Sequence, residues 1–149
     1  MEWAALIAWI VTAGGGFVLL AIWLRRGGMR QREGERLIKP PLILSHFALA
    51  ATGLVIWIIY LATDSDALGW IALAALGVVA LLGFGMFSVW YWQRQQRGVA
   101  AAPGGTSAAG TAEVPAEQHF PVSIVALHGL LAVTTVALVF LTDIGVGGS

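Results

Sequence analysis

Charged side chains and cysteine are what this sequence has least of. Only 11% of its 149 residues are charged, against about 25% in an average soluble domain. So few charges cannot cover a water-exposed surface, which excludes a soluble enzyme domain, a disordered tail and a nucleic-acid-binding domain. The complete absence of cysteine excludes disulfides, thiolate metal ligands and cysteine redox chemistry.

Long apolar runs occupy most of the chain instead. Four windows of 22 to 25 residues contain no Asp, Glu, Lys or Arg: 3–24, 41–62, 68–92 and 121–142. A helix needs about 20 such residues to cross a hydrocarbon core of roughly 30 Å. We therefore predict a single all-α domain over residues 1–149, an integral membrane four-helix bundle whose solvent is the lipid bilayer.

The basic residues fix the expected orientation, because all eight fall on one side of the four spans. They are Arg25, Arg26, Arg30, Arg32, Arg36, Lys39, Arg94 and Arg97. The positive-inside rule makes that side cytoplasmic and places both termini outside. The excess of Ala, Gly and Val, and of Arg over Lys, is typical of a GC-rich genome, so we expect a bacterial cytoplasmic membrane.

The remaining segments fit this topology. No basic region and no small-residue cleavage site accompany the first span, so we expect a retained helix and not a signal peptide. Residues 93–118 are rich in Ala, Gly, Ser, Thr and Pro, which predicts a flexible cytoplasmic loop. Aromatic residues at the span ends predict an interfacial belt: Trp3, Trp23, Trp70, Trp90, Tyr91 and Trp92.

The second and fourth spans share the pattern H-x-x-L-A-x-T, which begins at His46 and at His128. Both spans start after a proline, Pro41 or Pro121, and both end in Thr-Asp. The first and third spans close on similar Trp-containing segments. This similarity predicts two helical hairpins related as parallel repeats.

His46 and His128 are the ionisable residues inside the spans, and such residues default to a functional hypothesis. At 1.5 Å per residue, His46 lies roughly 7–8 Å and His128 roughly 10 Å above the start of its span. The two imidazoles therefore sit at nearly the same depth on parallel helices. Two facing neutral imidazoles can ligate one haem iron, so we predict haem b with His46 and His128 as the metal ligands.

A haem also needs space and positive charge. Small residues of the inner half are expected to let a flat macrocycle approach: Gly14, Gly15, Gly16, Gly83, Gly85 and Gly129. Cations expected to pair with the propionates are Arg25, Arg26, Arg36 and Lys39.

His119 is either an exposed interfacial residue or a further propionate partner or proton donor. Met86 is either core filler or an alternative axial ligand.

At this point the pattern resembles small membrane b-type cytochromes, four-helix units that hold haem between paired histidines on two helices. The resemblance rests on His46, His128 and the surrounding glycines. It implies haem b and electron transfer, with a redox partner or a membrane partner subunit. The larger families carry more paired histidines for a second haem, and no second pair lies deep in these spans, which argues against a two-haem path.

Two other functions stay open. The first is a non-catalytic membrane scaffold or partner subunit, in which a carbonyl or Ser45 satisfies a buried histidine and small residues serve only packing. The second is a minimal transporter or quinone-site subunit lined by Thr52, Thr134 and Thr135. No phosphate-binding loop, catalytic triad or zinc motif appears, so we expect no enzymatic activity beyond electron transfer.

Overall fold

The computed structural model describes residues 1–31, 38–100 and 114–146. These ranges contain no strand. They hold α1 (Glu2–Arg25), α2 (Pro40–Thr63), α3 (Asp66–Ala100), the short 3-10 helix η1 (Ala116–His119) and α4 (Val122–Asp143). The four α-helices are each long and apolar enough to cross a membrane, which confirms the predicted all-α four-span architecture.

Local sequence explains where the helices begin and end. Helix α2 starts at Pro40. The first residues of a helix have no intrahelical acceptor for their N–H groups, so proline, which has no N–H, is well tolerated there. The residue after its end, Asp64, caps the helix. Asp64 takes a left-handed conformation with φ 49° and donates its N–H to the Tyr60 carbonyl. Helix α3 begins two residues later, so the turn is tight and α2 and α3 are antiparallel neighbours.

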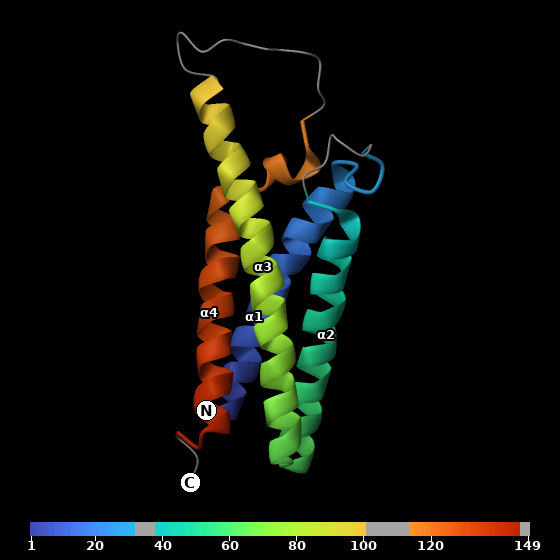
Figure 1. Cartoon of the computed structure of the whole chain (residues 1–149). Coiled ribbons are helices and arrows are strands. Elements are labelled where there is room, and N and C mark those ends of the chain that lie inside the picture. Colours follow the sequence, from blue (N-terminus) through green and yellow to red (C-terminus); the bar gives the residue numbers. More distant parts are fainter. Residues whose placement is uncertain (32–37, 101–113, 147–149) are drawn as a thin grey trace.

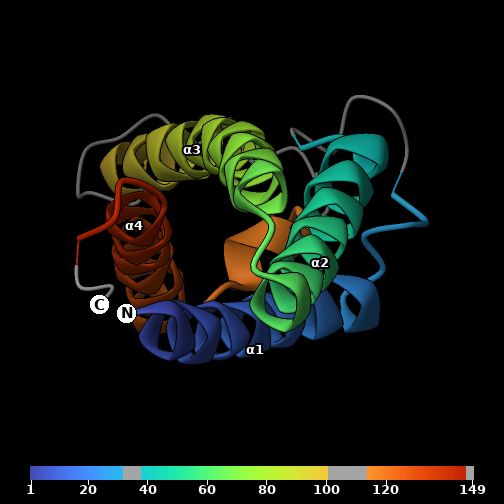
Figure 2. The same cartoon turned by 90° about the horizontal axis from the view of Figure 1, so that it is seen from below.

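The four helices form a ring in which α1 packs mainly on α4 and α2 mainly on α3 (Figures 1 and 2). Helices α2 and α4 are diagonally opposite and run in the same direction, as the repeat predicts (Figure 2). Both chain termini lie at one end of the bundle, which we call the terminal end (Figure 1). The opposite end carries η1 and the start of α2, and we call it the loop end.

The apolar core lies in the terminal half of the bundle. Its members are Ala5, Trp9, Trp57, Tyr60, Ala72, Leu76 and Val139. Trp57 is fully buried, with ring centroids 6.5 Å from Trp9 and 4.7 Å from Tyr60. Every long helix also exposes large apolar side chains, for example Ile7, Val55, Leu81 and Leu130, as a surface in contact with lipid requires.

The predicted loop over residues 93–118 is wrong at both of its ends. Helix α3 continues to Ala100, eight residues past the predicted span end, because the Gln and Arg residues there are good helix formers. Gln95 supports this extension by donating to the Tyr91 hydroxyl at 2.7 Å. Residues 116–119 form η1, and 101–113 lie outside the described residues.

The six residues of the predicted aromatic belt divide by exposure. Trp3, Trp70, Tyr91 and Trp92 are exposed. The other two are buried within the chain, since Trp23 is 1% and Trp90 4% exposed. Trp23 is covered by the backbone of Gly28, where a Cβ atom would overlap its ring, and Trp90 is covered by η1.

Candidate functional site

The two intramembrane histidines meet across the centre of the bundle. His46 on α2 and His128 on α4 are half-buried, with ring centroids 6.5 Å apart and ring planes at 65°. Their helices are diagonal in the ring, so the side chains and not the backbones make this approach (Figure 2). The structure thus brings together the pair that the depth match predicts.

A backbone carbonyl on the neighbouring helix orients each ring. Nδ1 of His46 lies 3.1 Å from the Val79 carbonyl oxygen on α3, and Nδ1 of His128 lies 2.9 Å from the Thr12 carbonyl oxygen on α1. A carbonyl only accepts, so in the neutral imidazole Nδ1 carries the proton and donates it. The lone pair then resides on Nε2 of both rings, and this atom is the one through which each imidazole could act as an acceptor or a metal ligand.

Glycine makes room for both rings in the same way. A Cβ atom on Gly83 would lie 3.1 Å from Cε1 of His46, and one on Gly16 would lie 3.1 Å from Cε1 of His128. In both cases the glycine follows the carbonyl-bearing residue by four positions on the same helix. The two halves of the site are therefore built alike, in agreement with the repeat read from the sequence.

The other glycines named in the sequence do not clear space for a ligand inside the bundle. A Cβ atom on Gly14, Gly85 or Gly129 would meet nothing within 4 Å, and all three residues are exposed. Gly15 and Gly16 face the His128 ring itself. The expectation of a glycine-lined slot for a macrocycle is thus wrong for the outward-facing positions, because adjacent residues of a helix point in different directions.

The threonines do not form a shared polar lining. Thr52 and Thr134 are exposed, and each hydroxyl donates to the carbonyl four residues earlier on its own helix. Thr135 is fully buried, and its Oγ1 lies 3.1 Å from that of Thr12 on α1. The Thr12–Thr135 contact joins α1 to α4. Thr52, Thr134 and Thr135 do not line one common path.

The predicted propionate partners separate in the structure. Arg25 and Arg26 at the end of α1 line a hollow of about 310 Å³ together with Ile22 and His119. Lys39 is exposed and caps the start of α2. Arg36 lies outside the described residues.

His119 and Met86 are both half-buried. His119 is the last residue of η1, and its Nδ1 atom is buried without a hydrogen-bond partner in the described part of the chain. The expectation of a freely exposed interfacial histidine is therefore wrong. Met86 lies on α3 beyond Gly83. The residue of α3 that faces the His46 ring is Gly83, and not the candidate sulfur ligand Met86.

A polar network that no sequence motif marks holds η1 across the loop end of the ring (Figure 2). Trp90 Nε1 donates to the Glu117 carbonyl at 3.0 Å. The Ala116 N–H donates to Gln31 Oε1 at 3.2 Å, and Gln118 Nε2 donates to Gln93 Oε1 at 2.7 Å. The partners are separated by tens of residues in sequence, so local pattern could not reveal them.

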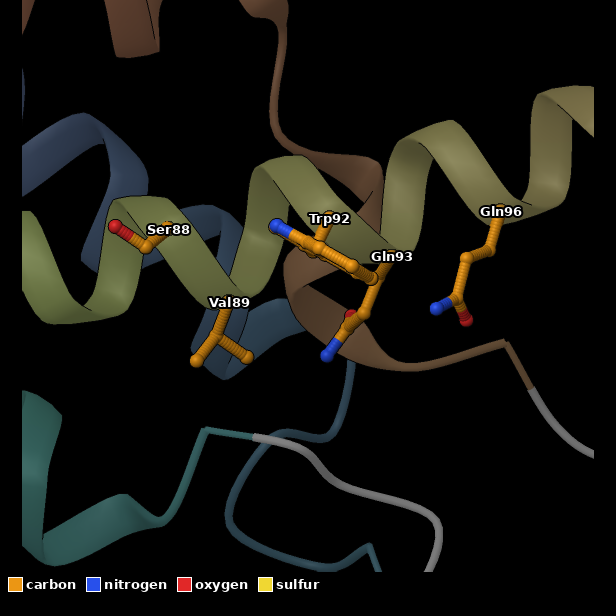
Figure 3. Close-up of a pocket in the computed structure, with 5 residues that line it drawn as sticks. All are labelled: Ser88, Val89, Trp92, Gln93 and Gln96. Atoms are coloured by element: carbon orange, nitrogen blue, oxygen red, sulfur yellow. The ribbon is translucent and has the colours of Figure 1, made fainter.

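A second hollow, of about 390 Å³, runs along the loop-end part of α3. Its lining residues are Ser88, Val89, Trp92, Gln93 and Gln96, and Figure 3 shows Val89, Gln93 and Gln96 directed to the same side of the helix. It contains none of the predicted haem-binding residues, and Trp92 is its one member of the predicted aromatic belt. This hollow is open and belongs to a single helix, so it defines no enclosed ligand site.

Comparison with known proteins adds no relative to this geometry. No protein-family model, curated protein or solved structure matches the chain. The function is therefore argued from the histidine pair and its surroundings alone.

Proposed function

We propose that this chain is a bacterial cytoplasmic-membrane protein that holds one b-type haem between His46 and His128 and takes part in electron transfer. The observation that carries the proposal is the convergence of two imidazoles from diagonal helices, each with Nδ1 engaged and Nε2 left for a ligand. A buried His is the commonest metal ligand in proteins, and this tautomer is the ligating one.

The spacing of the rings supports axial ligation. Metal–imidazole bonds of about 2 Å on both sides of one ion put two ring centroids roughly 6 Å apart, close to the 6.5 Å between His46 and His128. Within the described residues no group of three or more His, Cys, Asp or Glu could hold a metal ion. Two histidines alone do not complete the coordination of a bare ion, whereas a porphyrin brings its own equatorial nitrogens.

Each group of this site has a definite task in the proposal. The carbonyls of Val79 and Thr12 fix the orientation and tautomer of the two imidazoles, as outer partners of metal-bound histidines do. Positive charge at the loop end, carried by Lys39 with Arg25 and Arg26, favours propionates directed to that end. When bound, the haem iron supplies one-electron oxidation and reduction.

The proposed orientation has the loop end in the cytoplasm. In the described residues the basic side chains Arg25, Arg26, Arg30, Lys39, Arg94 and Arg97 flank the loop-end termini of the helices. The acidic residues Glu2, Asp64, Asp66 and Asp143 lie at the terminal end. A reporter fused after residue 149 should be active only when exported, and cytoplasmic activity of the fusion would reverse the assignment.

The haem proposal is tested by absorbance of the protein purified from haem-replete cells. We expect a Soret band that shifts on reduction, and its loss in H46A and in H128A. T52A and T134A are matched controls, since each alters a polar residue six positions further along the same helix. Both controls should keep the band.

Substitution by asparagine separates ligation from a purely structural role. Asparagine keeps an N–H donor near the position of Nδ1 but has no counterpart of Nε2. If the histidines ligate iron, H46N and H128N lose the Soret band as the alanine variants do. A colourless wild-type protein would overturn the proposal.

The structure gives one specific reason for a second candidate, a non-catalytic scaffold or partner subunit. The bonds to Val79 and Thr12 join α2 to α3 and α4 to α1, so the histidines also fasten the bundle. This candidate predicts that H46N and H128N unfold like the wild type while H46A and H128A are less stable. Unfolding in detergent, followed by circular dichroism, measures the difference.

A further inference from the structure

We propose that the hollow between Arg25, Arg26 and His119 binds the phosphate of an anionic phospholipid from the membrane leaflet at the loop end. We call this site the basic hollow; it also includes Ile22. The basic hollow shares no residue with the His46–His128 pair itself. Arg25 and Arg26 are also cations that the haem proposal offers to the propionates, and the experiment below separates the two assignments.

The two arginine side chains of the basic hollow are available to an oxyanion. Arg25 ends α1 and Arg26 caps it, and both side chains are exposed. Neither forms an ion pair with any residue that the structure describes. The planar guanidinium group of arginine matches the geometry of phosphate oxygens. Two such groups side by side, without a carboxylate between them, therefore form an anion site.

His119 forms part of the wall of the basic hollow beside the two arginines. Its Nδ1 atom is buried and has no hydrogen-bond partner within the described ranges, so this nitrogen is out of reach of a ligand in the hollow. The half-buried ring therefore shapes the site, and the two arginines supply the hydrogen bonds to the oxyanion.

The basic hollow is held in place before any ligand arrives. His119 ends η1, whose buried residues Ala116 and Glu117 are bonded to Gln31 and Trp90. The arginines continue a regular helix that packs on η1. The backbone of the site is therefore fixed before a ligand binds, and only the arginine side chains lose conformational freedom on binding.

The apolar wall of the basic hollow favours a lipid over free phosphate. Ile22 lines it, and Val18, one turn further into the span, is 45% exposed. Both residues belong to the apolar part of α1 that is long enough to cross the membrane. An acyl chain can therefore lie along Val18 and Ile22 while the phosphate meets the arginines, at the level where lipid head groups lie.

The distance along α1 separates the basic hollow from the histidine pair. Gly16 packs on His128, and Arg25 is nine residues further along the helix. At 1.5 Å per residue this is roughly 14 Å towards the loop end. The arginines are thus placed at the surface of the bundle, while the histidines meet at its centre.

The test measures lipid retained by the full-length chain after exchange into vesicles of phosphatidylglycerol and phosphatidylcholine, with native mass spectrometry as the readout. We expect R25Q/R26Q to lose about tenfold or more of the bound phosphatidylglycerol, since one hydrogen bond between a charged donor and a phosphate oxygen accounts for roughly tenfold. H119A should lose part of it. The matched control R94Q/R97Q removes two charges from the same end but outside the basic hollow, and should keep its lipid.

Other outcomes overturn the proposal. Equal loss in R94Q/R97Q would mean that net charge and not a site attracts the lipid. Displacement of the bound lipid by inorganic phosphate would mean that the ligand is a soluble anion. Loss of the Soret band in R25Q/R26Q with unchanged lipid would assign the arginines to the haem propionates. Circular dichroism verifies that each variant is folded, and H119A tests the site without changing an arginine.

Discussion

The two halves of this bundle are held together by different interactions, although the same four helices run through both. In the terminal half, large apolar and aromatic side chains fill the centre, with Trp57 at the middle of the packing. In the loop-end half, the centre holds His46 and His128, and η1 is tied across the end by hydrogen bonds. The terminal half is stabilised by the packing of large side chains. The loop-end half is stabilised by hydrogen bonds and by small residues that make room for the imidazole rings.

The difference teaches where function can reside in such a small membrane protein. A closely packed aromatic core tolerates little change in volume and leaves little room for a ligand. The loop-end half instead holds two imidazole rings packed on glycines, and it carries cationic side chains near its end. The terminal half thus stabilises the bundle, which leaves the loop-end half free for chemistry.

The largest expected effect is W57A, which removes the fully buried indole at the centre of the terminal half. Loss of a large buried aromatic costs about 3–5 kcal/mol. Reversible unfolding in detergent should show this loss, while W3A, at a residue 67% exposed, should change stability little. W57F should cost less than W57A, because it leaves a smaller cavity and removes an Nε1 atom without a partner among the described residues.

Alanine in place of glycine tests the loop-end half. In G16A and G83A the new Cβ atom lies 3.1 Å from a histidine ring, so the ring must shift. Overpacking of this kind costs about 1–3 kcal/mol. G14A and G85A are controls two residues away on the same helices, where a Cβ atom meets open space and alanine gains up to about 1 kcal/mol of helix propensity. If all four variants were destabilised equally, the glycines that face a histidine ring would not differ from those that face open space.

A smaller and more local effect is expected for Q31A. It removes an acceptor for the Ala116 N–H and a donor to the Val114 carbonyl, so η1 loses about 1 kcal/mol of net stabilisation for each good hydrogen bond. Amide hydrogen exchange of residues 114–120 should accelerate, while exchange of the four long helices stays unchanged. Q95A, which alters an exposed residue of α3, is the control. Unchanged exchange in Q31A would mean that η1 does not depend on this contact.

The smallest effect is expected at the contact that lies between the two halves. T12V and T135V each remove the bond between the two hydroxyls, which averages about 0.6 kcal/mol in membrane helices. T52V and T134V remove a hydroxyl that bonds only to its own helix, so their unfolding free energies should stay close to the wild type. The four variants measured together isolate the contribution of the interhelical bond.

The fold was largely predictable, and the site only in part. The absence of charge over each span predicts four helices, and their bounds differ from the prediction by a few residues except at the end of α3. The depth of His46 and His128 predicts that they lie at one level. The sequence does not reveal their carbonyl partners Val79 and Thr12, because any residue of a neighbouring helix offers a carbonyl.

The members of the basic hollow were predictable, but the hollow itself was not. The sequence offers Arg25, Arg26 and His119 each as a partner of the haem propionates. It does not place His119 beside the arginines, because more than ninety residues separate them. Only the docking of η1 against α1 brings them together.

By itself, the sequence determined the number of spans, their length and the depth of each residue along them, because hydropathy and helical rise are properties of a local segment. Only the tertiary structure decided how each helix is rotated and which helix it packs on. These helices are apolar on nearly every side, so no periodic stripe in the sequence marks an inward face. Rotation and pairing depend on how side chains such as Trp57, Gly16 and Gly83 fit their neighbours, and that fit exists only when all four helices are assembled.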